Sequence, residues 1–344
     1  MSSVPSSRIP SFDGLRALSI LLVLLGHASG TRNFPIQDMI LTSYYANAAV
    51  QVFFVISGFL ITTLLLRERE KTGAIRLKNF YVRRSYRILP AAYTYMLVAT
   101  AVFYATLRPT EIALAFTYLS SYALHPSWIM GHMWSLSVEE QFYLIWPAAM
   151  AISTAFARRL ALCTFVIDPV LRVALATAGR PQGTYSFFPL VADALATGCL
   201  LALFQPALEK HRGFFQWRGF LLIWGLTFTL PLMAEPHARV YLFAGMTILH
   251  VGIALCIQNA MVMRYRLLNA TVPVWIGTVS YSLYLWQEPF LNPYYRSWFT
   301  MFPVNMMLAF LAAIASYYAV ERPMLRLRDR RVPSPASGEP GGCS

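Results

Sequence analysis

Three ionisable residues, Asp13, Arg16 and His27, lie within the first apolar segment of the chain, FDGLRALSILLVLLGHASG. Ionisable side chains are costly inside a membrane span and by default mark a functional site. In an α-helix, the eleven residues from Arg16 to His27 end about 20° from where they start and roughly 16 Å further along the axis. Asp13 is three residues before Arg16, near the same face. The spacing therefore predicts an acid, a guanidinium and an imidazole along one stripe of a membrane helix.

This stripe suits acyl transfer. An imidazole titrates near neutral pH, so His27 can take the proton of a hydroxyl while that hydroxyl receives an acyl group. Arg16 stays charged and can hold an anion or a developing oxyanion. A histidine that only hydrogen-bonds a neighbouring helix is the alternative. The position of His27 on the same stripe as Arg16 and Asp13 favours the functional interpretation.

Two further segments carry side chains that fit this chemistry. In QVFFVISGFLITT, the small pair Ser57-Gly58 predicts close approach of another helix, and a gap for a thin acyl chain is the alternative. In KNFYVRRSYRILP, Arg83, Arg84 and Arg87 stand at the predicted cytoplasmic entrance of a helix. They fit either ordinary anchoring at the membrane surface or the phosphates of a donor such as coenzyme A.

The segment HMWSLSVEEQFYLIWP carries paired carboxylates. Ser137 and Glu140 have the spacing of a capping box, so Glu140 is expected to satisfy amides at a helix start. Glu139 is not at a capping position and could accept a proton or bind sugar hydroxyls, with Tyr143 as an aromatic neighbour. His132 lies nearby, but interfacial histidines are often incidental.

Composition places all of these segments in a membrane protein. The 344 residues are 57% hydrophobic and 12% charged, with a mean hydropathy of +0.51, whereas a globular domain has about a quarter charged residues. Apolar runs long enough for spanning helices recur along the whole chain. The sequence predicts an all-α polytopic bundle of about ten spans, near 12–30, 46–66, 89–107, 135–157, 160–178, 188–204, 219–235, 239–258, 272–292 and 301–320. A short stretch, 111–124, is expected to be re-entrant or interfacial.

The net charge of +13 follows from topology. With the N-terminus in the cytoplasm, the inner segments hold 21 lysines and arginines and the outer segments hold five. This ratio fits the positive-inside rule, places both termini in the cytoplasm and argues against nucleic-acid binding. We therefore expect a multi-pass protein of the inner (plasma) membrane, in contact with membrane lipids.

The chain divides into a short cytoplasmic segment (1–11), a membrane domain (12–325) and a basic, then disordered, cytoplasmic tail (326–344). Its four cysteines stand singly, without the spacing of a metal site, and are expected to be structural thiols. The tail after residue 331 is rich in Pro, Gly and Ser, which predicts disorder.

The segments FDGLRALSILLVLLGH, FFVISGFLITT, RRSYRILP, MWSLSVEEQFYLIWP, GTVSYSLYLWQEP and VERP together resemble the membrane acyltransferase-3 family. The resemblance covers nearly the whole chain, in order. It implies transfer of an acyl group, often acetyl, from cytoplasmic acyl-CoA to a hydroxyl of a surface, lipid-linked or secreted carbohydrate, with no permanently bound cofactor or metal. The resemblance implies catalytic roles for Arg16, His27 and Glu139, and donor binding at Arg84 and Arg87.

The chain departs from the family pattern at two places. Relatives often read YLWHWP where this chain has Gln287 and Glu288, and many carry an arginine where Ala192 precedes Asp193. We expect both departures to affect which acceptor is bound more than the type of reaction. We include Asp193 and Glu288 among the supporting residues. No SGNH-type domain follows the last span, so any transfer onward to such a domain would use a separate extracytoplasmic partner.

The resulting hypothesis places the nucleotide of acyl-CoA at the arginines and its pantetheine arm along the Arg16–His27 stripe. His27, oriented by Asp13 or Glu139, would deprotonate the acceptor. Direct transfer and a brief acyl-enzyme both stay open. A proton-coupled transporter would also use buried His, Asp and Glu residues, and a non-catalytic scaffold of the cell envelope is a further alternative.

Overall fold

The computed structural model describes residues 9, 11–178, 186–217, 219–233 and 241–332, and this part of the chain is helical, without strands. The predicted tail from residue 333 onward, including Cys343, lies outside the described residues. Among the described cysteines, Cys199 and Cys256 are buried, as expected, whereas Cys163 is exposed.

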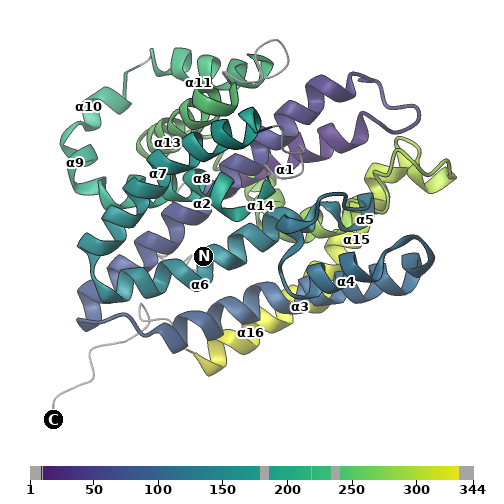
Figure 1. Ribbon diagram of the computed structural model, residues 1–344, viewed down its shortest axis with the longest axis horizontal. Helices are drawn as coiled ribbons and strands as arrows, with labels where there is room; N and C mark the ends of the chain where they lie inside the picture. Colours follow the sequence, from purple (N-terminus) through teal and green to yellow (C-terminus); the bar gives the residue numbers. More distant parts are fainter. Residues whose placement is uncertain (1–8, 10, 179–185, 218, 234–240, 333–344) are drawn as a thin grey trace.

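Helix α1 (Phe12–Ala28) lies in the middle of the bundle. It packs against α2 (Met39–Thr72) on one side and α14 (Thr271–Trp286) on the other. Helix α2 packs in turn against α8 (Phe188–Leu203), and α8 against α7 (Thr154–Thr177). The helix that carries the polar stripe therefore has neighbours on several sides (Figure 1).

The remaining long helices flank this centre. Helix α3 (Leu77–Phe103) runs beside α16 (Arg322–Arg331), and α11 (Phe220–Thr229) packs against α13 (Met246–Met263). Helix α6 (Met133–Ile152) contacts both α2 and α3. Figure 1 shows α3 and α16 along one side of the bundle and α11 on the opposite side.

Short elements complete the described chain. Helix α15 (Val304–Ser316) continues through η7 (Tyr317–Glu321), a π-helical segment, into α16. The others are η1 (Tyr104–Thr106), α4 (Pro109–Phe116), η2 (Ser120–Tyr122), α5 (Trp128–Gly131), α9 (Gln205–Lys210), α10 (Arg212–Phe215), η4 (Leu230–Met233), η5 (Tyr241–Gly245) and η6 (Trp298–Thr300).

Five helices of the described chain are long and apolar enough to cross a membrane: Leu41–Thr72, Leu77–Thr106, Thr154–Thr177, Met246–Met263 and Val304–Arg331. The expected membrane helix bundle is therefore confirmed in kind, while the number ten and the side of each terminus stay predictions. In the short stretch 111–124, the only α-helix is the end of α4, whose eight residues extend about 12 Å. That length is far less than the roughly 30 Å of a bilayer core, so α4 does not span it.

Two glycines bring α2 and α8 into backbone contact. A Cβ added to Gly58 would lie 2.1 Å from the carbonyl oxygen of Leu195, and one added to Gly198 would lie 2.0 Å from that of Val55. No side chain fits at either position, because the atoms in the way belong to backbone. The packing interpretation of Gly58 accounts for this glycine, since the space beside it is filled by α8.

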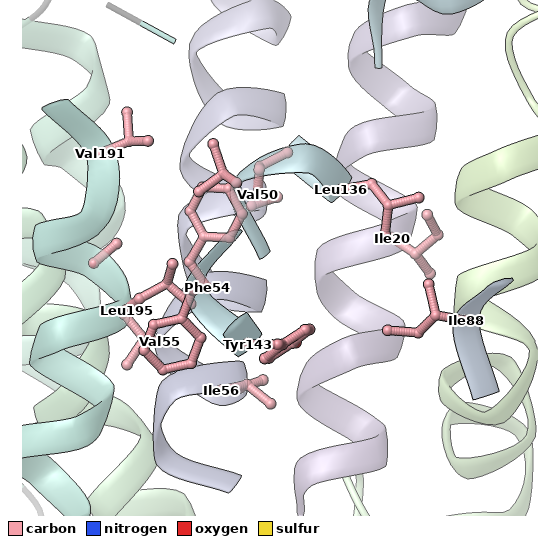
Figure 2. Packing of buried hydrophobic residues seen from close by; sticks show 14 of the residues in the cluster. Ile20, Val50, Phe54, Val55, Ile56, Ile88, Leu136, Tyr143, Val191 and Leu195 are labelled. Atoms are coloured by element: carbon pink, nitrogen blue, oxygen red, sulfur yellow. The ribbon is translucent and has the colours of Figure 1, made fainter. Parts of the chain in front are cut away.

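The middle of the polar stripe of α1 is buried among apolar side chains. Ile20 lies on this stripe between Arg16 and His27, and Figure 2 shows it beside Ile88 of α3 and Leu136 of α6. Ile20 has no exposed surface. Apolar side chains therefore fill the middle of the stripe and separate its two charged ends.

Candidate active site

Two histidines share one carboxylate at the C-terminal end of α1. The Nδ1 atom of His27 lies 3.4 Å from Oε1 of Glu288, and the Nδ1 atom of His132 lies 3.7 Å from the same oxygen. The Glu288 side chain is 4% exposed and that of His27 is 25% exposed. We call these three residues the histidine cluster. A buried carboxylate between two imidazoles can orient both rings and stabilise a positive charge on either.

Local structure explains how the cluster forms. His27 stands in the last turn of α1, His132 joins the short α5 to α6, and Glu288 follows the end of α14. Within the described chain, no hydrogen-bond partner reaches either ring nitrogen of His132 or Oε2 of Glu288. Buried polar atoms left without partners are rare, and here they accumulate in one place.

Aromatic residues hold the cluster in position. The indole N–H of Trp128 donates to the carbonyl oxygen of Glu288 (3.2 Å), and its ring lies edge-on to His27 with 5.2 Å between centroids. The hydroxyl of Tyr284 donates to the carbonyl oxygen of His132 (3.1 Å) and lies 2.6 Å from the hydroxyl of Ser135. The sequence favours an incidental role for His132, whereas the structure places it in the histidine cluster.

A second polar group, which we call the Glu139 cluster, joins side chains of α2, α3 and α6. The carboxylate of Glu139 accepts hydrogen bonds from Ser57 (2.7 Å) and Tyr143 (3.2 Å). The Nη2 atom of Arg84 lies 3.8 Å from Glu139, and its guanidinium carbon lies 3.7 Å from the centre of the Tyr143 ring.

The capping role expected of Glu140 is wrong. Helix α6 begins at Met133, four residues before Ser137, and its N-cap makes no side-chain hydrogen bond. The hydroxyl of Ser137 instead donates to the carbonyl oxygen of Met133 (2.9 Å). Glu140 is therefore an interior residue of the helix, and the sequence spacing alone did not show this.

Arg16 and Arg87 share an acidic neighbour that the sequence analysis missed. Glu321, in the π-helical segment η7, is within electrostatic range of both guanidinium groups and accepts a hydrogen bond from Ser282 (2.9 Å). Single π-helical turns are frequent at functional sites. The VERP segment was a signal for this residue, because its glutamate is an ionisable group in an apolar surrounding.

The three arginines of α3 point to different partners. Arg84 pairs with Glu139, and Arg87 is within electrostatic range of Arg16 and Glu321. The Nη2 atom of Arg83 lies 3.5 Å from Oε2 of Glu68 near the end of α2. Arg84 and Arg87 therefore join the polar groups inside the bundle, and Arg83 stands outside them.

Two supporting residues lie elsewhere than the sequence analysis supposed. Asp13 is fourteen residues before His27 on the same helix, about 21 Å along its axis, which is too far to orient that imidazole. Asp193 pairs through both oxygens with Arg172 of α7 (2.9 and 2.8 Å) and lies 3.1 Å from Nδ1 of His250. An arginine from another helix thus stands beside Asp193, where many relatives have one at the preceding position.

The geometry fits proton transfer and anion binding at opposite ends of one helix. The histidine cluster supplies a base with a carboxylate behind it, as in enzymes that activate a hydroxyl. The end that carries Arg16 supplies guanidinium groups, which suit phosphates and oxyanions. Within the described residues, no group of three His, Cys, Asp or Glu side chains could hold a metal ion.

The comparisons with known proteins agree with this chemistry. A family model described as an acyltransferase domain matches residues 9–321. The peptidoglycan O-acetyltransferase OatA of Listeria monocytogenes is 29% identical over 83% of this chain and 49% of its own length. The Bacillus subtilis protein YrhL, provisionally named a peptidoglycan O-acetyltransferase, is 28% identical over 92% of this chain and 55% of its own length.

The chain thus spans about half the length of the curated relatives it matches. No solved structure matches it. The family model extends over more than nine-tenths of the residues, and it takes in both the histidine cluster and the arginines at the other end of α1. The chain belongs to the acyltransferase-3 family, as its motifs predicted, with residues 9–321 matching that family's acyltransferase domain.

Proposed function

We propose that the protein transfers an acetyl group from cytoplasmic acetyl-CoA to a hydroxyl of a cell-envelope carbohydrate, and that it does so in the inner membrane. The observation that carries the proposal is the histidine cluster, in which Glu288 stands behind the Nδ1 atom of His27. The Nδ1 atom of His27 makes no hydrogen bond to Glu288 at this distance, and we take the other ring nitrogen, Nε2, as the atom that accepts the proton of an acceptor hydroxyl. The names of the relatives make peptidoglycan the first carbohydrate to test.

In the proposed reaction, the two ends of α1 have different roles. The acceptor oxygen attacks the thioester carbonyl while its proton passes to His27, and the developing imidazolium is stabilised by Glu288. The thiolate of coenzyme A then leaves and takes up that proton. Arg84 and Arg87 would hold the phosphates of the donor, since guanidinium groups bind phosphate in a forked geometry.

The route between the ends passes buried apolar side chains. Ile20 and Val23, which lie on the stripe between Arg16 and His27, are 0% and 1% exposed. An acetylated pantetheine arm would have to displace them to reach His27. The spacing of roughly 16 Å between Arg16 and His27 is of the same order as the length of that arm.

A direct assay tests the proposal. The protein would be reconstituted in proteoliposomes with labelled acetyl-CoA and the soluble disaccharide repeat of peptidoglycan. We expect label on the saccharide, dependent on protein. A proton-coupled transporter, which the buried Arg172–Asp193–His250 group would also suit, would move unmodified saccharide without acetyl-CoA. Uptake with no labelled product would favour the transporter and contradict the proposal.

Loss of charge at the α3 arginines is expected to weaken donor binding. Arg84→Gln or Arg87→Gln should raise the KM for acetyl-CoA by roughly 10-fold, because a charge-assisted hydrogen bond contributes about 1.5–3 kcal/mol. Acetyl-pantetheine lacks the nucleotide phosphates, so its KM should change little if the arginines bind those phosphates. Kinetics with both donors in each variant measure the difference.

The exposed Arg159, at the start of α7, provides the matched control. Arg159→Gln should leave the KM of both donors unchanged. An equal rise in KM for acetyl-CoA and acetyl-pantetheine in the α3 variants would show that Arg84 and Arg87 act on the protein or the acyl arm and not on the phosphates.

A further inference from the structure

Aromatic side chains lead from the surface to the histidine cluster. Tyr294 is 75% exposed, and its ring lies 5.8 Å from that of Trp128, at 74°. Trp128 is partly buried, and its ring lies 5.2 Å from that of His27, at 65°. Tyr294 and Trp128 thus form a series of two rings. Tyr294 is open to the surface at one end, and Trp128 at the other end contacts the imidazole that we propose as the base.

The loop that carries Tyr294 is held firmly against the rest of the site. The backbone N–H of Tyr294 donates to the side chain of Asn292 (2.9 Å), which is 2% exposed. The next residue, Tyr295, stacks on Phe103 with 6.1 Å between centroids. The Tyr294 ring is therefore exposed on a backbone that is tied to a buried side chain, and each such tie lowers the entropic cost of binding a ligand.

Interfacial anchoring alone does not explain Trp128. Tyrosine and tryptophan are common at both surfaces of a membrane, where their rings contact headgroups. Trp298 fits that description, since it is 69% exposed and its ring lies 5.9 Å from that of the neighbouring Phe299. Trp128 differs, because its N–H is bonded to the backbone of Glu288 and its ring touches His27.

We propose that Trp128 and Tyr294 form the acceptor subsite, in which a sugar ring stacks on the aromatic faces and presents one hydroxyl to His27. The C–H groups on one face of a pyranose carry a slight positive charge and lie flat on the electron-rich face of an aromatic ring. Two rings inclined at 74° can contact a face and an edge of the sugar. This inference rests on the proposed function and adds the residues that recognise the acceptor.

Saturation-transfer NMR tests the subsite without any acyl donor. The probe is the soluble disaccharide repeat of peptidoglycan, added to the full chain in nanodiscs. We expect saturation of the sugar C–H protons with the unmodified protein and with Tyr294→Phe, which keeps the ring. Tyr294→Ala should lower it several-fold. Trp298→Ala is the matched control and should retain it, because Trp298 lies outside the series.

Kinetics separate the subsite from the reaction. In the acetyl-transfer assay, Tyr294→Ala should raise the KM for the disaccharide by roughly 5- to 10-fold and leave kcat close to that of the unmodified protein. An unchanged KM in Tyr294→Ala would overturn the subsite, and so would an equal rise in KM in Tyr294→Ala and Trp298→Ala. In either case, acetyl transfer by the unmodified protein would still uphold the proposed function. Absence of saturation with the unmodified protein would also overturn the subsite. Absence of acetyl transfer by the unmodified protein would contradict the function itself.

Discussion

Replacement of His27 by alanine is expected to lower kcat for acetyl transfer by about 10²- to 10⁴-fold, the usual contribution of a positioned general base. The reason is that the acceptor hydroxyl would lose the group that takes its proton during attack on the thioester. Transfer of labelled acetyl groups by equal amounts of purified protein measures the effect. The KM for acetyl-CoA should change little, because the nucleotide is proposed to bind at the other end of α1.

Two further variants make this prediction specific. His211→Ala removes an exposed histidine at the end of α9 and should keep full activity. Glu288→Gln keeps the shape of the side chain behind His27 but removes its charge, so a loss smaller than that of His27→Ala is expected. Full activity in His27→Ala would overturn the assignment of the base, and full activity in Glu288→Gln would show that its charge has no part in the reaction.

Replacement of Arg172 by methionine is expected to destabilise the protein by about 3–5 kcal/mol, the range found when one partner of a buried ion pair is removed. Both Arg172 and Asp193 have fully buried side chains, and the pair joins α7 to α8. Thermal unfolding of the purified protein, followed by size-exclusion chromatography, measures the loss.

A double variant separates the ion pair from the packing around it. Arg172→Met with Asp193→Leu leaves no buried charge without a partner in this pair, so it should recover much of the stability that Arg172→Met loses. Arg159→Met changes an exposed arginine of the same helix and should have little effect. An unfolding midpoint of Arg172→Met equal to that of the unmodified protein would show that the pair does not hold α7 and α8 together.

Properties set by local sequence were predicted well. Apolar runs require helices in a membrane because every backbone polar group must be satisfied internally, and the described chain is helical. The α1 helix contains Asp13, Arg16 and His27, as the spacing of the first segment predicted. The motifs predicted the family through their resemblance to it, and the family model over residues 9–321 confirms that prediction.

The partners of the charged side chains could not be predicted in the same way. Glu140 has the spacing of a capping residue, but α6 begins four residues before Ser137 and leaves Glu140 in the helix interior. Glu321 lies far along the chain from Arg16, and only the packing of α14 and η7 brings them close. His132 and Glu288 belong to separate segments and meet because α1, α6 and α14 converge.

The sequence by itself determined the class of the protein and the stripe that bears Arg16 and His27, because hydropathy and helical period act over a few turns of chain. Its family followed from the resemblance of its motifs. Only the tertiary structure decided that Glu288 and not Asp13 stands behind His27, and that Arg172 pairs with Asp193. These contacts depend on which helices approach closely, and glycines such as Gly58 and Gly198 control that approach by letting backbones touch. A pairing between helices is a property of their packing, which no single segment specifies.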